Sequence, residues 1–351
     1  MKEIMEELRK NGFESFIVGG YVRDYILGHE NFDIDISTNA SIEDIIRIFG
    51  DRGTSNKEYY SYHIDDGKYN YDITSYRKEL EYKKNKPIRI IPAKTFRQDL
   101  LRRDFTINTL AIDINGKLVD RLCVKKDLDK KIIKVVGNIN KKFEEDKTRI
   151  LRAIRFYSTL EFELDNEIKK FLREKKEYLN EIPKEFKRKE IDKIFNSKSH
   201  KRFFDLVLEY DLEKVLNIKL KGDVKDSYDK YGIYAQIETD LVFSKKEKNI
   251  IKEIKEKINN KVFKISDIFK YDDIIVNNVA WILDINEEVK SVKEISTIKS
   301  IIEIDITIED LLQYINIKDI KRVYKQIEKD IMRGLLINER AYIIEYLKGV
   351  E

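Results

Sequence analysis

The pattern of apolar and polar positions changes near residue 140. Before that point, short apolar or alternating segments separated by turn residues predict strands and a few helices. Gly28 is placed to end one of these helices. The expected strands span 16–20, 32–38, 69–76 and 109–114, with helices over 2–11 and 21–28. This part of the chain is therefore predicted to be an α/β domain, a small mixed sheet backed by helices.

After residue 140 the apolar residues recur at helical spacing. The segment 142–160 has acidic residues in its first turn and arginines further on, with Ile150, Ile154 and Tyr157 three to four apart, which predicts one continuous helix. Further helices are expected over 165–178, 186–196, 200–215, 245–257, 307–315, 318–332 and 337–348. We therefore expect an α/β domain followed by an all-α region.

Composition narrows the class of protein. A chain of 351 residues with 42% hydrophobic residues can form two to four modest domains, which excludes disorder as its main state. Its net charge of +4 excludes an indiscriminate polycation. One cysteine and three histidines without zinc-site spacing leave oxygen ligands for any metal. No apolar run approaches about 18 residues and no signal peptide is recognisable, so we expect a cytoplasmic protein without a membrane segment.

Two carboxylates stand out in the expected strand over 32–38. Asp33 and Asp35 are two residues apart, so both project from one face of the strand while Ile34 and Ile36 project from the other. Such a pair can bind hard divalent cations, which activate an attacking hydroxyl and stabilise the leaving oxygen in phosphoryl transfer. The other interpretation of the same pattern is a strand edge that faces solvent.

A glycine pair precedes these carboxylates. Gly19 and Gly20 end the first strand, where backbone N–H groups can approach a phosphate, and Arg23 follows in the first turn of the next helix. Glycine pairs also form ordinary turns, but GGYVRDYILG followed by FDIDIST favours a phosphate site. Asp72, in YDITSYR, is a third candidate carboxylate or else a surface ion-pair partner.

Two later segments suggest nucleotide contacts. In RRDFTIN, Arg103 can meet a phosphate and Asp104 or Asn108 a ribose 2′-hydroxyl, although a helix cap with charged flanks would look similar. In the expected helix over 142–160, Asp146 and Arg149 share a face. They form either a local salt bridge or a pair that accepts from an exocyclic amine and donates to ring acceptors, as adenine and cytosine require.

Four motifs of this chain resemble, in order and approximate spacing, those of the class II tRNA nucleotidyltransferase and bacterial poly(A) polymerase family. They are GGYVRDYILG, DID, RRDFTIN and EDKTRILRAIRF. Within this family, the chain most resembles the bacterial CCA-adding enzymes. The resemblance covers about the first 200 residues well and the rest more loosely. It implies a nucleotidyltransferase head at 1–138, a neck for nucleobase recognition at 139–200, a body at 201–290 and a tRNA-binding tail at 291–351.

The resemblance also implies residue roles. The metal carboxylates fall on Asp33 and Asp35, and the third catalytic acid on Asp72. The neck motif has Phe186 where the family usually has arginine, so no ligand is carried over from it. The implied nucleotide contacts are Gly19, Gly20 and Arg23 for the triphosphate, Arg103, Asp104 and Asn108 for phosphate and ribose, Asp146 and Arg149 for reading CTP and ATP without a nucleic-acid template, and Arg152 as an additional contact.

The function implied is addition of CMP, CMP and AMP to the tRNA 3′ end with release of pyrophosphate, with Mg²⁺ as cofactor and tRNA, CTP and ATP as partners. No obligatory protein partner is evident. The locally basic stretch 169–202 is either a set of solvated helix faces or a surface for tRNA phosphates. The segment 76–87 occupies the place of the family's flexible loop, which favours addition of A. An A-adding enzyme, a poly(A) polymerase and an inactive tRNA-binding relative remain alternatives.

Overall fold

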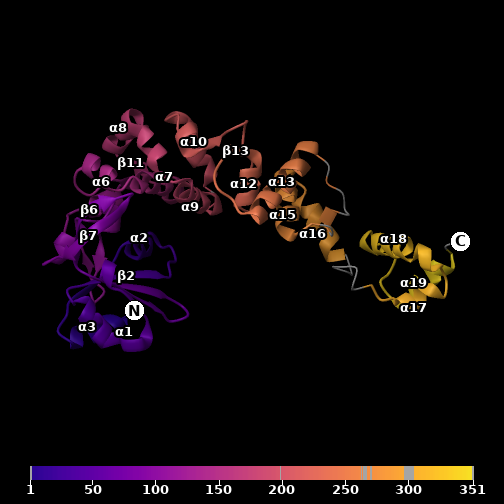
Figure 1. Ribbon diagram of the computed structural model, residues 1–351, viewed down its shortest axis with the longest axis horizontal. Coiled ribbons are helices and arrows are strands. Elements are labelled where there is room, and N and C mark those ends of the chain that lie inside the picture. Colours follow the sequence, from indigo (N-terminus) through magenta and orange to yellow (C-terminus); the bar gives the residue numbers. More distant parts are fainter. Residues whose placement is uncertain are drawn as a thin grey trace. The chain divides into compact units, whose positions relative to one another are not determined.

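The computed structural model describes residues 2–197, 199–261, 263, 267–268, 271–295 and 304–349. The chain forms two compact units, Met1–Asn217 and Ile218–Glu351 (Figure 1). The finer division into head, neck, body and tail at 138, 200 and 290 stays a prediction.

The first unit contains a seven-stranded sheet with the order β3-β4-β5-β2-β1-β8-β9. Strands β2 and β5 pair in parallel, whereas the other neighbours are antiparallel. This confirms the predicted mixed sheet. Its strands are β1 (Ser15–Val18), β2 (Asp33–Thr38), β3 (Thr54–Asn56), β4 (Ser61–Asp65), β5 (Asn70–Ser75), β8 (Ala111–Ile112) and β9 (Leu118–Val119).

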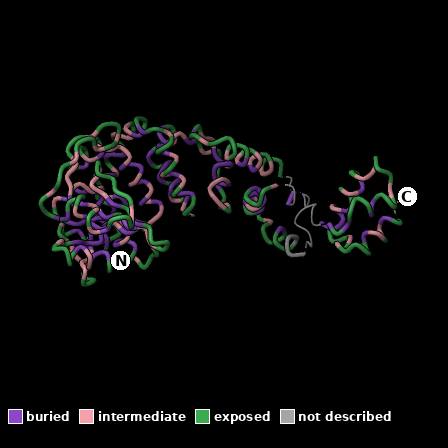
Figure 2. The backbone as a smooth tube through the Cα atoms, turned by 60° about the horizontal axis from the view of Figure 1, so that its bottom comes forward, coloured by how far each residue is buried: buried purple, intermediate pink, exposed green. Residues whose placement is uncertain are grey.

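Each face of this sheet has its own apolar layer. On one face, alternate residues of β1, β2, β4 and β5 are buried, namely Ile17, Ile34, Ile36, Tyr62, Ile64, Tyr71 and Ile73. Helices α1 (Lys2–Lys10) and α3 (Ile42–Phe49) cover this face with Met5, Leu8 and Ile45 (Figure 1). On the opposite face Phe16 of β1 stacks on Phe96 of α4 (Phe96–Leu100), with ring centroids 4.3 Å apart. Buried positions occur both in the sheet and along the helices of each unit (Figure 2).

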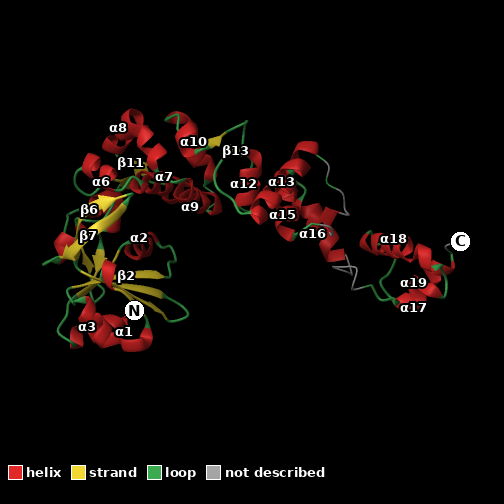
Figure 3. Ribbon diagram, in the orientation of Figure 1, coloured by secondary structure: helices red, strands yellow, loops and turns green. Residues whose placement is uncertain are grey.

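Most of the remaining elements are helices (Figure 3). In the first unit they are α2 (Gly20–Leu27), α5 (Lys125–Asp129), α6 (Ile139–Glu145), α7 (Thr148–Leu160), α8 (Asn166–Lys175), α9 (Lys184–Asn196), α10 (His200–Glu209) and α11 (Glu213–Leu216). In the second they are α12 (Lys230–Gln236), α13 (Lys245–Asn260), α15 (Asp273–Ile282), α16 (Asn286–Ile295), α17 (Ile308–Leu312), α18 (Ile320–Met332) and α19 (Arg340–Lys348). The two-stranded pairs β10 (Ile132–Ile133) with β11 (Glu163–Leu164) and β12 (Ile218–Lys219) with β13 (Glu238–Thr239) accompany them.

The prediction of one helix over 142–160 is wrong. Asp146 has an extended backbone, with φ −144° and ψ 99°, and separates α6 from α7. Its carboxylate accepts hydrogen bonds from the backbone N and the hydroxyl of Thr148, at 2.9 and 2.6 Å. A short polar side chain that satisfies nearby N–H groups competes with helix continuation. The helix expected over 200–215 is likewise divided, at Asp211, whose φ is 51°.

The segment 76–87 is not a loop. Strands β6 (Arg77–Lys83) and β7 (Lys86–Pro92) pair as an antiparallel hairpin (Figure 3). Lys84 and Asn85 form its turn with φ values of 51° and 63°. Two consecutive left-handed residues are typical of the tight turn that matches strand twist. The strand expected over 109–114 is also shorter than predicted, since β8 spans only Ala111–Ile112.

The second unit has its own apolar clusters. One is centred on Leu311, Ile327 and Ile343, from α17, α18 and α19. Another joins α12, α13 and α15 through Ala235, Ile254 and Val279. Within the described residues, no helix is both long and apolar enough to cross a membrane.

A substitution at Gly53 can test how tightly β3 and β4 pack. A Cβ there would collide with the carbonyl O of His63 and lie 2.8 Å from Tyr62 Cε1, although the φ of Gly53 is an ordinary −161°. We expect Gly53→Ala to lower the free energy of unfolding by about 3 kcal/mol through overpacking. Gly116→Ala is the control, because Gly116 has φ +79° but open space, and should cost only about 1 kcal/mol. Equal costs in urea unfolding would contradict this packing.

Candidate active site

Strand β2 holds the predicted carboxylates between β1 and β5. Asp35 is paired with Val18 on β1 and with Asp72 on β5, and Asp33 is paired with Asn70. Because paired residues of neighbouring strands project to the same side, Asp33, Asp35 and Asp72 share one face of the sheet. Asp33 and Asp72 are exposed and the Asp35 side chain is 49% exposed. The structure therefore brings the three predicted acids together.

Each of these carboxylates has a polar neighbour. Asn70 Nδ2 donates to Asp33 Oδ1 at 3.1 Å, and His63 Nδ1 lies 3.0 Å from Asp72 Oδ1. His63 belongs to β4 and is paired directly with Asp72, so the sequence offered no local sign of this contact. Burial raises the pKa of the Asp35 carboxyl; Arg103 opposes that shift and Asp72 adds to it.

The carboxylates present hard oxygen donors, the kind that divalent cations bind. Among the described residues, no group of three or more His, Cys, Asp and Glu side chains is arranged to hold a metal ion. Mg²⁺, however, commonly uses one or two carboxylates and takes its other ligands from phosphates and water. Asp33 and Asp35 supply such a donor set, and the backbone opposite Asp35 leaves room beside it.

Gly19 provides that room. Its φ of 87° and ψ of −146° are conformations that essentially only glycine adopts. A Cβ at this position would collide with Asp35 Oδ2 and lie 3.3 Å from Arg103 Nη1. Gly20 begins α2, whose first backbone N–H groups follow this turn. The turn is therefore suited to backbone contact with an anion next to the carboxylates.

Arg103 is the predicted arginine that lies beside the carboxylates. Its Nη1 is 4.0 Å from Asp35 Oδ2 and its Nη2 is 3.8 Å from Asp99 Oδ2, and its side chain is only 12% exposed. Among the described residues, none accepts a hydrogen bond from the buried Arg103 Nε. A guanidinium with such long contacts retains donors for a phosphate.

Asp99 was missed by the sequence reasoning. It is fully buried, accepts from Arg102 Nε at 2.8 Å and from Ser37 Oγ at 2.9 Å, and so anchors the residues before Arg103. Its spacing of three and four residues from Arg102 and Arg103 was the available signal.

Four of the predicted residues form a chain of side-chain contacts, in the order Arg23, Asn108, Asp104 and Arg152. Arg23 Nη1 donates to Asn108 Oδ1 at 2.8 Å, and Asn108 Nδ2 donates to Asp104 Oδ1 at 3.1 Å. Arg152 Nε and Nη2 both contact Asp104 Oδ2, at 2.7 and 2.6 Å. Burial alone would raise the pKa of Asp104, but Arg152 and the hydrogen bonds hold it well below its usual range. Arg23, predicted as a triphosphate contact, is itself buried against Asp24.

Asp146 and Arg149 are neighbours, but they do not share a helix face, because Asp146 precedes α7. Arg149 Nε lies 3.9 Å from Asp146 Oδ2. The Arg149 guanidinium is buried, donating to the Lys142 carbonyl at 3.0 Å and to Tyr82 Oη at 3.1 Å. Tyr82 in turn donates to Glu79 at 2.6 Å. Tyr82 and Glu79 come from the hairpin that was expected to be a loop, which is why sequence reasoning missed both.

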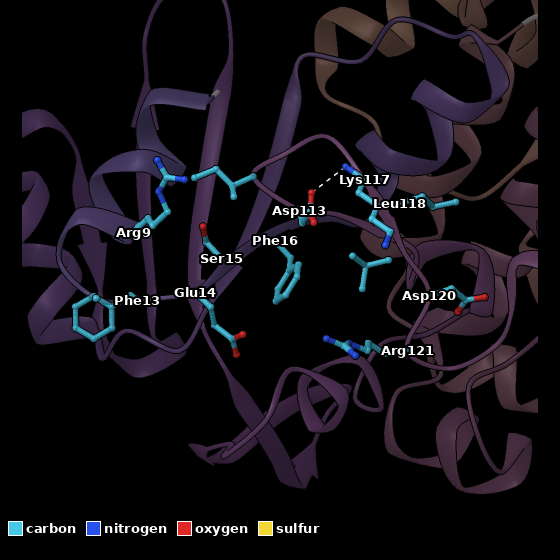
Figure 4. Close-up of a pocket in the computed structure, with 13 residues that line it drawn as sticks. Arg9, Phe13, Glu14, Ser15, Phe16, Asp113, Lys117, Leu118, Asp120 and Arg121 are labelled. Atoms are coloured by element: carbon cyan, nitrogen blue, oxygen red, sulfur yellow. Dashed lines mark hydrogen bonds between the residues drawn. The ribbon is translucent and has the colours of Figure 1, made fainter.

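Two pockets in the described part of the chain have linings without Asp33, Asp35 or Asp72. One, of about 710 Å³, lies at the start of β1 and along the turn from β8 into β9, and its lining includes Arg9, Phe16 and Arg121 but no predicted site residue (Figure 4). A second, of about 480 Å³, is lined in part by Tyr82 and Lys142. Burial and Arg149 lower the pKa of Lys142 to about 8.

Comparison of the sequence with known proteins identifies relatives of this chain. The model of the poly(A) polymerase head domain matches residues 15–134. A CCA-adding enzyme of Bacillus pumilus is 34% identical over 66% of this chain, an alignment that spans 58% of the relative's length. A CCA-adding enzyme of Ligilactobacillus salivarius is 30% identical over 98% of this chain and 95% of its own length.

Two solved structures share the fold over nearly the whole chain. The CCA-adding enzyme of Bacillus stearothermophilus in complex with CTP has a TM-score of 0.73 at 20% identity, covering 99% of this chain and 95% of that one. The Thermotoga maritima CCA-adding enzyme complexed with tRNA_CCA has a TM-score of 0.68 at 19% identity, covering 99% and 93%. With a full-length relative at 30% identity and this shared fold, the chain belongs to the family of CCA-adding enzymes, which are nucleotidyltransferases.

Proposed function

We propose that this protein adds CMP twice and AMP once to the 3′ end of tRNA, using CTP and ATP without a nucleic-acid template and releasing pyrophosphate. The observation that carries the proposal is the pair Asp33 and Asp35 on β2, directly opposite the open turn at Gly19 and beside Arg103. The relatives named above are CCA-adding enzymes, and solved members bind CTP and tRNA_CCA. This supports the same substrates here.

We infer that the metal of this site is Mg²⁺, held by Asp33 and Asp35, because both ligands are hard carboxylate oxygens. When bound, Mg²⁺ lowers the pKa of the attacking hydroxyl and neutralises charge on the phosphates. Asp72 lies on the adjoining strand with His63 beside it, where it can orient the RNA terminus.

The other predicted residues divide by the part of the nucleotide that they are proposed to bind. Gly19 and Arg103 border Asp35. Together with Gly20, the first residue of α2, they are proposed to bind the triphosphate. Asp104 and Asn108 are proposed to meet the ribose, and Asp146 and Arg149 the base. Arg23 and Arg152 hold Asn108 and Asp104 through their side chains, which supports an indirect role for both in binding nucleotide.

The stretch 169–202 is proposed to contribute to tRNA binding, but not with all of its cations. Lys187 is buried and donates to the Val215 carbonyl at 2.7 Å, so it stabilises the fold. The cations of this stretch that are exposed are Lys170, Arg173, Lys189, Lys193 and Lys201. We expect their affinity for tRNA phosphates to fall steeply as salt rises. Because tRNA, CTP and ATP are cytoplasmic, we infer that the enzyme acts in the cytoplasm.

The function is tested with purified protein, Mg²⁺, labelled CTP or ATP, and three tRNAs that end before the first C, after the first C and after the second C. We expect CTP to be incorporated into the first two and ATP only into the third. An A-adding enzyme would use ATP on the third tRNA and never CTP. A poly(A) polymerase would extend any of the three with ATP repeatedly, and an inactive relative would bind tRNA without incorporating either nucleotide.

Removing either metal carboxylate should abolish the reaction. We expect Asp33→Ala and Asp35→Ala each to lower the rate of CMP incorporation by at least about a thousandfold, because the site loses half of its protein ligands. Asp33 is exposed and the Asp35 side chain is 49% exposed, so thermal unfolding should change little. Near-normal incorporation by Asp33→Ala would contradict the assignment.

The space at Gly19 can be tested apart from its backbone conformation. Gly19→Ala adds a Cβ against Asp35 Oδ2, whereas Gly50→Ala, at the end of α3, meets open space in a similar glycine-type backbone conformation, with φ 55° and ψ −122°. Each should cost about 1 to 3 kcal/mol of stability from that backbone conformation. Only Gly19→Ala should also lower kcat/KM for CTP, by about a hundredfold through displacement of the carboxylate. Equal activities of the two variants would refute the role of the open turn.

A further inference from the structure

Two asparagines flank β2. Asn31 precedes the strand, and its Oδ1 accepts a hydrogen bond from the backbone N of Asp33 at 2.9 Å. Asn39 follows the strand, and its Oδ1 accepts from the backbone N of Glu14 at 2.9 Å. The two bonds are alike in type and length, but only the first is made to the backbone of a proposed metal ligand. The position of Asp33 therefore depends on what holds Asn31.

Asn31 is held from its other end by Asp24. Its Nδ2 donates to Asp24 Oδ2 at 2.7 Å, while Asp24 Oδ1 accepts from Arg23 Nε at 2.8 Å. Asp24 and Arg23 are both buried, in the first turns of α2. A charged pair in a buried setting has few alternative partners, so its geometry is well determined. Asn31 is thus held by Asp24, whose own carboxylate is held by Arg23 of the same helix.

The chain of contacts continues to the nucleotide-binding residues. Arg23 donates to Asn108, Asn108 to Asp104, and Arg152 to Asp104, at 2.8, 3.1 and 2.7 Å. The guanidinium carbons of Arg23 and Arg152 lie over the same ring, that of Phe156, at 5.0 and 5.5 Å from its centroid. Side-chain contacts therefore run without a break from the backbone of Asp33 to Arg152 on α7.

We propose that Asn31 is a positioning residue that ties Asp33 to this polar chain, so that the metal-binding carboxylate and the ribose-binding end of the site are held in register. The proposal rests on the proposed function. Asn31 does this through both ends of its carboxamide: the oxygen holds the Asp33 amide and the nitrogen holds Asp24. Outer-shell partners of metal-binding carboxylates commonly affect activity about tenfold or more.

Three variants separate this role from a general loss of stability. Asn31→Ala removes both bonds. Asn31→Asp keeps an acceptor for the Asp33 amide but places a carboxylate against Asp24, so only the bond toward Asp24 is lost. Asn39→Ala is the matched control, because it removes a similar asparagine-to-backbone bond at the far end of β2.

We expect Asn31→Ala and Asn31→Asp each to lower kcat for CMP incorporation about tenfold with KM for CTP changed less than about twofold. Asn39→Ala should keep wild-type kcat. Independently of activity, hydrogen exchange of the amides in residues 31–35 should accelerate in both Asn31 variants and remain slow in Asn39→Ala, and Mn²⁺ binding followed by electron paramagnetic resonance should weaken in the Asn31 variants alone.

Two results would overturn the proposal. If Asn31→Ala matched Asn39→Ala in kcat, exchange and Mn²⁺ binding, Asn31 would have no positioning role. If Asn31→Asp behaved as wild type, the bond to the Asp33 amide alone would suffice and the link to Asp24 would be irrelevant. Failure of the proposed function itself would look different, because the wild-type protein would then incorporate no CMP although the exchange pattern of the variants could still be measured.

Discussion

Strand β2 has no freedom to shift its register, and the candidate site follows from this. It lies between β1 and β5, with Ile34 and Ile36 buried under α1 and α3. A shift by one residue would expose these isoleucines and bury Asp33 and Asp35 among the apolar residues described on that face, which offer no compensating charge. The hydrophobic layer on one face therefore dictates where the two carboxylates stand on the other.

After the register of β2, the second constraint on the candidate site is the pairing of its charged side chains. Three guanidinium groups, those of Arg23, Arg152 and Arg155, lie within 5.5 Å of the centroid of the Phe156 ring. Each is neutralised by its own carboxylate: Asp24, Asp104 and Glu190, respectively. Arg103 differs, because its nearest carboxylate oxygens are 3.8 and 4.0 Å away. The contrast between paired arginines and this loosely paired one supports Arg103 as the group that meets a phosphate.

The features that could be predicted from the sequence are those set by residues close together in the chain. The alternation around Asp33 and Asp35 and the glycine turn before them are short-range features, and the structure has both. The prediction of one continuous helix over 142–160 failed at Asp146, because its carboxylate competes with the helix for the Thr148 amide. The spacing of apolar residues gives no information about such a contact. The hairpin over 77–92 was missed because it lacks an alternating apolar pattern and turns at Lys84 and Asn85 without a glycine. Tyr82 contacts Arg149, which is distant in sequence, and Asp99 joins its near neighbour Arg102 to the distant Ser37.

The proposed reaction requires Asp33 and Asp35 to hold the metal next to a triphosphate bound at Gly19 and Arg103. A crystal structure of the protein with CTP and Mn²⁺, with the ion located by its anomalous scattering, tests this most directly. We expect an anomalous peak in contact with both carboxylates, and phosphate oxygens against the glycine turn. A peak elsewhere, or CTP bound in the pocket along β8 and β9 with the two carboxylates left unliganded, would contradict it.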